Sequence, residues 1–154
     1  MTYSEKIKNF AVKEKPLILG IETSCDETAV SLVYNGREVL ADEIISSAAS
    51  HAVFGGVVPE IASRAHTTAI LTATDRALKT AGKKLADIDA VAVTYGAGLL
   101  GALLVGVSFA KALAYSLGVP LVPVSHIRGH VAAAYIADKA LEPPFMNILA
   151  SGGH

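Results

Sequence analysis

Two histidines four residues apart, His126 and His130, carry the clearest chemical signal in this sequence. On a helix, residues at i and i+4 lie one above the other, with Cβ atoms roughly 5–6 Å apart. Two imidazoles at that spacing can share one metal ion at roughly 2.0–2.1 Å per nitrogen. Ser125 is a preferred N-cap residue, so we expect a helix that begins at His126. The positive end of that helix dipole would favour the neutral, metal-binding imidazole.

The residues between the two histidines restrict the kind of site. Gly129 costs about 1 kcal/mol relative to alanine inside a helix, so we expect something to approach the backbone closely there. Ile127 and Arg128 occupy the place where a zincin protease carries its general base, so that base is missing here. Two partly buried histidines satisfied by their neighbours are the alternative to a metal centre, and the pair alone leaves both interpretations open.

Two polar turns are candidate ligand sites because each follows an apolar segment. In residues 22–28, hydroxyls and backbone amides could cradle phosphate oxygens, and Asp26 or Glu27 could hold a metal or orient a reacting group. Ordinary turn chemistry is the alternative interpretation. In residues 151–154, Ser-Gly-Gly-His, the two glycines allow a ligand to approach the backbone closely. Because the sequence stops inside this turn, we expect it to be a truncated product.

A glycine-rich segment at residues 96–101 matches the pattern Gly-x-Gly-x-x-Gly. A dinucleotide site would also need an acidic residue about twenty positions further on. Pro120 lies in that region, and no acidic residue does. We therefore set dinucleotide binding aside.

The apolar pattern predicts the elements that would position these residues. Asn35-Gly36 is a strong turn signal between two strands, and Pro59 fits the first position of a helix that ends before Gly82. Three meandering strands followed by alternating helices and strands indicate an α/β fold with a mixed sheet of ribonuclease-H-like type, in the order β-β-β-α-β-α-β-α-β. The expected strands are 17–22, 29–34, 38–46, 89–94, 121–124 and 145–150, and the expected helices are 59–81, 99–117 and 126–138.

Length and composition suit a single domain with a real core. The chain has 154 residues, of which 52% are hydrophobic and 18% charged. The net charge of −1 excludes a global basic field for nucleic acids, although a local patch or a partner could still bind them. One cysteine, Cys25, excludes a disulfide framework and is compatible with a reducing cytosol. Residues 1–16 lack the apolar segment of a signal peptide, and we interpret them as a polar leader.

Residues 96–124 form the most hydrophobic stretch, with Lys111 as the one charge. Its length raises the question of a membrane span, but glycine and proline at 118–120 and Pro123 divide it into a helix and a strand, so we expect no membrane span. Small residues recur there every four positions and form one helix face, which could pack on the chain's own sheet or on a partner helix. These residues are Gly98, Ala102, Gly106, Ala110 and Ala114.

Four segments in order closely resemble the TsaD family, also called YgjD or Gcp, and the resemblance covers the chain from about residue 17 to residue 154. They are residues 20–28 (GIETSCDET), 55–66 (GGVVPEIASRAH), 98–106 (GLLGALLVG), and 126–130 (HIRGH) with 151–154 (SGGH). The resemblance implies the N-terminal lobe of an actin-like ATPase (ASKHA) fold in residues 17–154, with a second lobe missing. It also implies an acyltransferase that moves threonylcarbamoyl from threonylcarbamoyl-AMP to N6 of the adenosine beside the anticodon, in tRNAs reading codons that start with A.

The resemblance also assigns roles to individual residues. It implies that His126 and His130 bind one iron or zinc ion per subunit, with a third ligand, an Asp, in the missing lobe. It implies an activity-related carboxylate at Asp26. The expected partners are tRNA, TsaB-like and TsaE-like proteins, with a homodimer through the small-residue face as a further candidate, and the expected location is cytoplasmic. The substrate-binding loop would be Leu149, Ala150, Ser151, Gly152 and Gly153.

Three departures from the family pattern are visible, at Ala97, Arg128 and Ala65, and none removes a metal ligand. The missing second lobe is the larger departure, so we expect this chain alone to bind metal weakly and to be inactive. Two alternatives stay open. One is an O-sialoglycoprotein metalloendopeptidase, an older label for the family, and the other is a non-catalytic lobe that dimerises.

Overall fold

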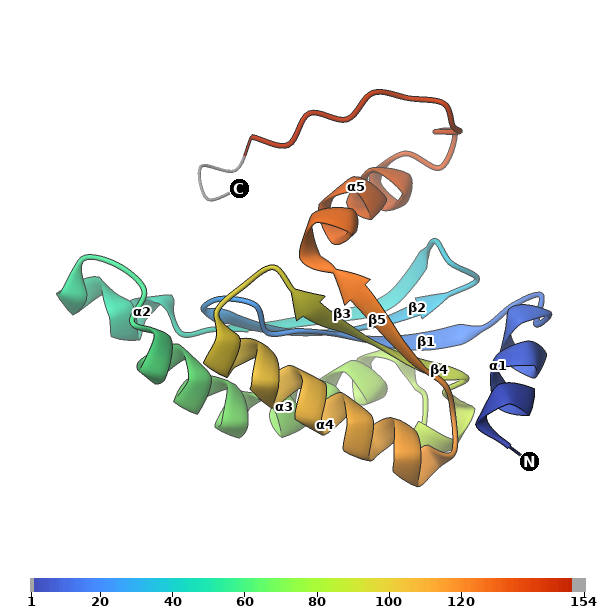
Figure 1. Cartoon of the computed structure of the whole chain (residues 1–154), viewed down its shortest axis with the longest axis horizontal. Helices are drawn as coiled ribbons and strands as arrows, with labels where there is room; N and C mark the ends of the chain where they lie inside the picture. The colour runs from blue at the N-terminus through green and yellow to red at the C-terminus, as the bar shows by residue number, and fades with distance from the viewer. Residues whose placement is uncertain (1, 151–154) are drawn as a thin grey trace.

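Residues 2–150, the part of the chain that the computed structural model describes, are built around a five-stranded sheet in the order β3-β2-β1-β4-β5 (Figure 1). The first three strands form an antiparallel meander, and the last two run parallel to β1. This is the mixed α/β sheet that the sequence predicts. The strands are β1 (Leu17–Glu22), β2 (Glu27–Tyr34), β3 (Glu38–Ser46), β4 (Ala90–Gly96) and β5 (Leu121–Ser125).

The hairpin between β2 and β3 turns at the predicted dipeptide. Asn35 and Gly36 have φ angles of 51° and 74°, and the Arg37 amide donates to the Tyr34 carbonyl at 3.3 Å. Two consecutive positive φ angles are the requirement of the tight turn that suits the twist of a hairpin. Asn and Gly tolerate that backbone best, so the local sequence sets where the hairpin turns, and the pairing of β2 with β3 shifts register between Leu32 and Val33.

Helices α3 (Pro59–Ala81) and α4 (Leu100–Leu117) cover one face of the sheet, below it in Figure 1. Pro59 stands in the first turn of α3, and Gly82 ends the helix with a φ of 62°. Both boundaries follow the prediction, because proline suits a helix start and glycine accepts the left-handed cap. The core lies between these helices and the strands, and it includes Leu19, Ile21, Val30, Leu32, Ile70, Ala73, Val91 and Ala110.

The small-residue face of α4 packs inside this chain. Ala102, Gly106, Ala110 and Ala114 are all buried, whereas Leu104 and Tyr115 on the same helix are 55% and 90% exposed. Tight packing within the domain is therefore the correct interpretation of the stripe, and any interface on α4 would have to use its other side. Within residues 2–150, α4 is also the one helix that is long and apolar enough to cross a membrane by length and composition, a test that core helices meet as well.

Helix α5 (His126–Ala137) stands over the opposite face of the sheet, above it in Figure 1. None of its residues is buried. Between α5 and the strands lies a cavity of about 670 Å³, lined by sheet residues such as Ser31, Asp42 and Thr94 and by both histidines of the helix. The two faces of the sheet are thus covered very differently.

Two predictions at the ends of the chain need correction. Residues 145–150 were expected to form a strand, but they run as a coil in which Met146 and Ile148 are 89% and 83% exposed. A strand is stable only when a neighbour pairs with its backbone groups, and this segment pairs with no strand of the described sheet. The polar leader contains a helix that was not predicted, α1 (Tyr3–Ala11). This helix begins with a capping box formed by Thr2 and Glu5.

Three short elements complete the described chain. They are α2 (Ala48–His51), the 3₁₀ turn η1 (Ala52–Phe54), and the 3₁₀ turn η2 (Leu85–Asp87). The first two connect the end of β3 to α3 and bring His51 into a buried position.

Candidate functional site

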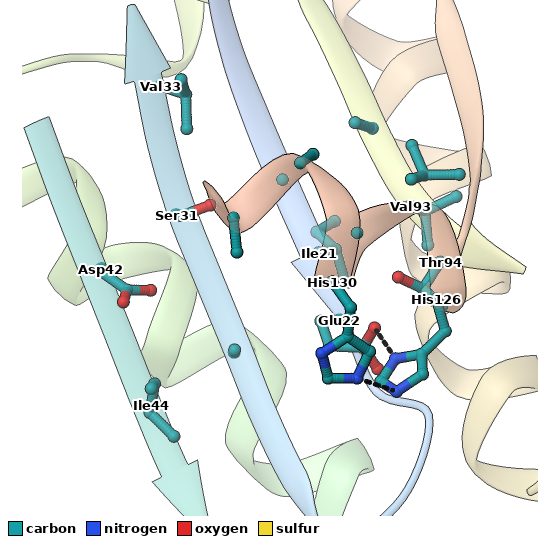
Figure 2. Close-up of a pocket in the computed structure, with 17 residues that line it drawn as sticks. Ile21, Glu22, Ser31, Val33, Asp42, Ile44, Val93, Thr94, His126 and His130 are labelled. Atoms are coloured by element: carbon teal, nitrogen blue, oxygen red, sulfur yellow. Dashed lines mark hydrogen bonds and ion pairs between the residues drawn. The ribbon is translucent and has the colours of Figure 1, made fainter. Parts of the chain in front are cut away.

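The two predicted metal ligands face each other at the start of α5 (Figure 2). Their Nε2 atoms are 3.1 Å apart, and their rings meet edge to face at 86° with centroids 4.6 Å apart. Two nitrogens roughly 2.0–2.1 Å from one ion would be about 2.9 Å apart at a right angle and about 3.4 Å apart at the tetrahedral angle. The observed separation lies between these limits, so the pair fits a single metal ion.

The first histidine is oriented by the end of β1. His126 Nδ1 lies 3.3 Å from Glu22 Oε2 and 3.3 Å from Ser24 Oγ. A carboxylate beside Nδ1 favours the proton on that nitrogen and leaves Nε2 as the ligand atom, which is the usual outer-shell support of a metal-binding histidine. The helix begins at His126 as predicted, although the Ser125 side chain makes no capping hydrogen bond to it.

Glu22 is held as a carboxylate. Burial raises the pKa of Glu22. Hydrogen bonds from Ser24, Thr94 and His126 together lower this pKa by more than burial raises it, so it lies below its ordinary value. A negative charge beside Nδ1 is therefore maintained at neutral pH. The same carboxylate lies on the side of the ring away from Nε2, so it does not replace the general base that a zincin carries after its first histidine.

Two further observations within residues 2–150 bear on the metal centre. These residues contain no group of three His, Cys, Asp or Glu side chains suited to hold a metal ion. A Cβ placed on Gly129 would meet no atom within 4 Å, so nothing described here uses the close approach that the glycine was expected to allow. Gly129 instead lines the cavity under α5.

The turn after β1 is hydrogen-bonded to the start of α4. Thr23 Oγ1 donates to the Ala102 carbonyl at 2.9 Å, and the Leu99 amide donates to the Ser24 carbonyl at 2.8 Å. A Cβ on Gly98 would lie 2.6 Å from the Ser24 carbonyl oxygen, and one on Gly106 would lie 2.3 Å from Thr23 Oγ1. These glycines are thus explained by packing against the turn.

Two buried histidines support the same turn, His66 by direct contacts and His51 through Ser47. His66 Nε2 is 3.0 Å from the Cys25 carbonyl oxygen, and His66 Nδ1 is 2.7 Å from Thr28 Oγ1. His51 bonds to Ser47, whose hydroxyl donates to the Asp26 carbonyl at 2.7 Å. His66 stands in the segment 55–66 that carries the family resemblance, but no role was predicted for it or for His51.

Asp26, the predicted activity-related carboxylate, is half-buried on this turn next to the exposed Cys25. Burial and the neighbouring Asp26 raise the pKa of the Cys25 thiol, so this cysteine is not an activated nucleophile. The role of Asp26 stays a prediction. The structure joins the turn to the histidine pair through Glu22 and Ser24.

The predicted substrate loop is only partly described. Leu149 is half-buried and Ala150 is exposed, both in the coil after α5. Ser151, Gly152 and Gly153 lie outside the described residues. Their part in the site therefore stays a prediction.

Known proteins resemble this chain closely. The profile of the family described as "TsaD: tRNA N6-adenosine threonylcarbamoyltransferase" matches residues 38–154. Proteins of that name from Clostridium perfringens (strain 13 / Type A) and Clostridium botulinum (strain Hall) are 57% and 54% identical over 92% and 93% of this chain. The chain spans 42% of the length of each. Among solved structures, YeaZ from Pseudomonas aeruginosa is similar with a TM-score of 0.60 and 25% identity, covering 78% of this chain and 48% of YeaZ.

Proposed function

This chain belongs to the TsaD family of tRNA N6-adenosine threonylcarbamoyltransferases, and from that premise we propose how a whole protein of the relatives' length would work. It transfers threonylcarbamoyl from threonylcarbamoyl-AMP to N6 of the adenosine next to the anticodon, in tRNAs reading codons that start with A. The observation that supports this best is the facing pair of Nε2 atoms, 3.1 Å apart, beside the turn that carries Asp26.

In this proposal the start of α5 binds the metal. His126 and His130 contribute their Nε2 atoms, and an Asp beyond the described residues contributes the third protein ligand. Glu22 orients His126 by accepting from Nδ1. The ion, iron or zinc, would act when bound as a Lewis acid toward the carbamoyl or phosphate oxygens of the donor.

The turn after β1 and the loop after α5 position the substrate. Asp26 orients a reacting group at one end of the site. The loop formed by Leu149, Ala150, Ser151, Gly152 and Gly153 binds the adenylate through its backbone. Because the transfer joins two bound substrates, proximity and charge stabilisation carry most of the acceleration.

We propose three partners for the whole protein, which would work in the cytoplasm: tRNA, a TsaB-like protein and a TsaE-like protein. Exposed apolar side chains on the outer side of α3 and α4 favour a protein partner there: Leu71, Leu100, Leu104 and Tyr115 are 65%, 75%, 55% and 90% exposed. The similarity of fold to YeaZ makes a partner of related fold the first choice. Self-association would use this same exposed surface rather than the buried stripe.

Replacement of both metal ligands tests the function. In the whole protein, His126→Ala with His130→Ala should abolish transfer of labelled threonylcarbamoyl to a tRNA transcript and should remove the bound metal. Glu14→Gln, an exposed change before β1, serves as the control and should keep full activity. Transfer retained by the double variant, with folding confirmed by circular dichroism, would refute the proposal.

The 154-residue chain gives a second test, because only two of the proposed ligands lie in it. We expect weak zinc binding by calorimetry and no transfer. Tight binding by the isolated chain would mean that the ligand set is complete without a second lobe.

A further inference from the structure

We propose that His51 and His66 are positioning residues that hold the backbone carbonyls of Cys25 and Asp26 from two directions. Both histidines are buried, with 3% and 0% of their surface exposed. Their hydrogen bonds go to Ser47 and Val58 for His51 and to Cys25 and Thr28 for His66, and the metal-based mechanism does not use either histidine. Their contacts nevertheless end on consecutive residues of the turn that carries the candidate carboxylate.

The His66 contacts fix which ring nitrogen carries the proton. Its Nε2 lies 3.0 Å from the Cys25 carbonyl oxygen, and because a carbonyl only accepts, Nε2 must be the donor. In a neutral ring Nδ1 is then the acceptor, so the Thr28 hydroxyl donates to it at 2.7 Å. His66 thereby ties α3 to both ends of the segment from Cys25 to Thr28.

The His51 contacts form a chain of hydrogen bonds that has one direction. The Val58 amide can only donate, so it donates to His51 Nδ1 at 3.3 Å. The proton of the ring is therefore on Nε2, which donates to Ser47 Oγ at 3.1 Å. Ser47 Oγ in turn donates to the Asp26 carbonyl at 2.7 Å. Because the Val58 amide can only donate and the Asp26 carbonyl can only accept, the direction of every hydrogen bond between them is fixed.

The Asp26 carbonyl accepts twice from one residue, since the Ser47 amide also donates to it at 2.9 Å. Each buried polar group in this network has a partner, which is the condition under which a buried network stiffens a site. The backbone of Asp26 is thus set by α2 and α3 and not by turn propensity alone. That this positioning serves catalysis rests on the proposed function, whereas the positioning itself does not.

Nuclear magnetic resonance of the ring nitrogens tests the positioning in the 154-residue chain without any activity. Long-range ¹H–¹⁵N correlation distinguishes the two neutral tautomers. We expect His51 and His66 both to carry the proton on Nε2 at pH 7.5. A proton on Nδ1 of His51, or fast averaging of either ring, would overturn the proposal.

Amide hydrogen exchange provides a matched pair of variants. Ser47→Ala removes the hydroxyl that donates to the Asp26 carbonyl, and Ser116→Ala removes one that donates to the Leu113 carbonyl at 2.9 Å, far along α4. We expect at least about tenfold faster exchange in residues 23–28 for Ser47→Ala and no change there for Ser116→Ala. Unchanged exchange in Ser47→Ala would contradict the proposal.

Kinetics of the whole protein connect the network to Asp26. His51→Leu keeps the side-chain volume, and we expect it to lower kcat on the order of 10²-fold with little change in KM, while His51→Gln, which restores an N–H near the Nε2 position, recovers part of the loss. In an Asp26→Ala background, His51→Leu should add less than about twofold. Full multiplication of the two effects would show that His51 does not act through Asp26. If Asp26→Ala alone is fully active, the catalytic role proposed for Asp26 fails, and the tautomers still decide the positioning.

Discussion

The face of the sheet under α3 and α4 is packed, whereas the face under α5 is open. On the packed face, Leu19 and Leu32 are completely buried, and glycines let α4 approach the turn after β1. On the open face, a cavity of about 670 Å³ separates the strands from α5, a helix with no buried residue. The candidate site lies at the end of β1, where the turn after this strand reaches the start of α5.

The candidate site has two parts, the turn that carries Asp26 and the histidine pair on α5, and different contacts hold each part in place. The turn that carries Asp26 is held by α4 through Thr23 and by α3 through His66. The histidine pair on α5 is joined to the end of β1 by the contacts of His126 with Glu22 and Ser24. The comparison therefore predicts that equal changes on the two faces have unequal effects on stability.

The largest expected effect concerns two apolar truncations of similar size. Leu32→Ala on the packed face should lower the free energy of unfolding by about 2–5 kcal/mol, because it leaves a cavity in the core. Ile44→Ala, at a side chain that lines the open cavity and is 55% exposed, should cost less than about 1 kcal/mol. Urea unfolding of both variants measures the difference, and equal losses would mean that the open face is as well packed as the other.

The next effect concerns the contact between α4 and the turn. A Cβ on Gly106 would lie 2.3 Å from Thr23 Oγ1 and 3.3 Å from Thr23 Cβ, and the buried Thr23 has no room to move away. Gly106→Ala should therefore destabilise the fold by about 1–3 kcal/mol, despite the better helix propensity of alanine. A variant as stable as the original protein in urea would show that the turn can shift without cost.

The sequence predicted the packed face well because its signals are local. The apolar run of β1, the Asn35-Gly36 turn, and the proline and glycine that bound α3 each act within a few residues. The i, i+4 spacing of His126 and His130 likewise predicted their facing nitrogens. Helix α1 was also within reach, because the Thr2–Glu5 pair is a recognisable capping box.

The remaining features depend on contacts distant in the chain. Cys25 and His66 are 41 residues apart, and Glu22 and His126 are 104 apart. No local pattern indicates which histidine will reach which carbonyl, so the roles of His51 and His66 could not be predicted. The expected strand at 145–150 failed for a related reason, because a strand depends on a partner that a local apolar pattern does not supply.

A third predicted effect depends on pH and concerns Glu22, which connects the turn that carries Asp26 to His126 on α5. Hydrogen bonds hold the pKa of Glu22 below its ordinary value, so the folded state binds its proton less tightly than the unfolded state does. Its contribution to stability is therefore complete above the unfolded value of about 4.3 and is lost as pH falls through the lower folded value.

The measurement compares the original chain with Glu22→Gln in the presence of a chelator. We expect Glu22→Gln to be the less stable of the two at pH 7, and the difference to shrink as pH falls below about 4. A difference that is constant from pH 7 to pH 3 would mean that Glu22 does not link the turn to α5 through its charge.

The smallest expected effect has the opposite sign and separates the two faces most cleanly. Gly129, like Gly106, is a glycine inside a helix, but a Cβ there would meet no atom within 4 Å. Gly129→Ala should therefore stabilise the chain by roughly 0.5–1 kcal/mol, because alanine loses less backbone entropy in a helix. Zinc binding by His126 and His130, measured by calorimetry, should be unchanged, since the new methyl group points into open space. If Gly129→Ala instead destabilises the 154-residue chain, α5 must lie closer to the sheet in solution. If it harms only the whole protein, the glycine is needed for something that occupies the open face there, which would restore the close approach that its position in the first turn of α5 originally suggested.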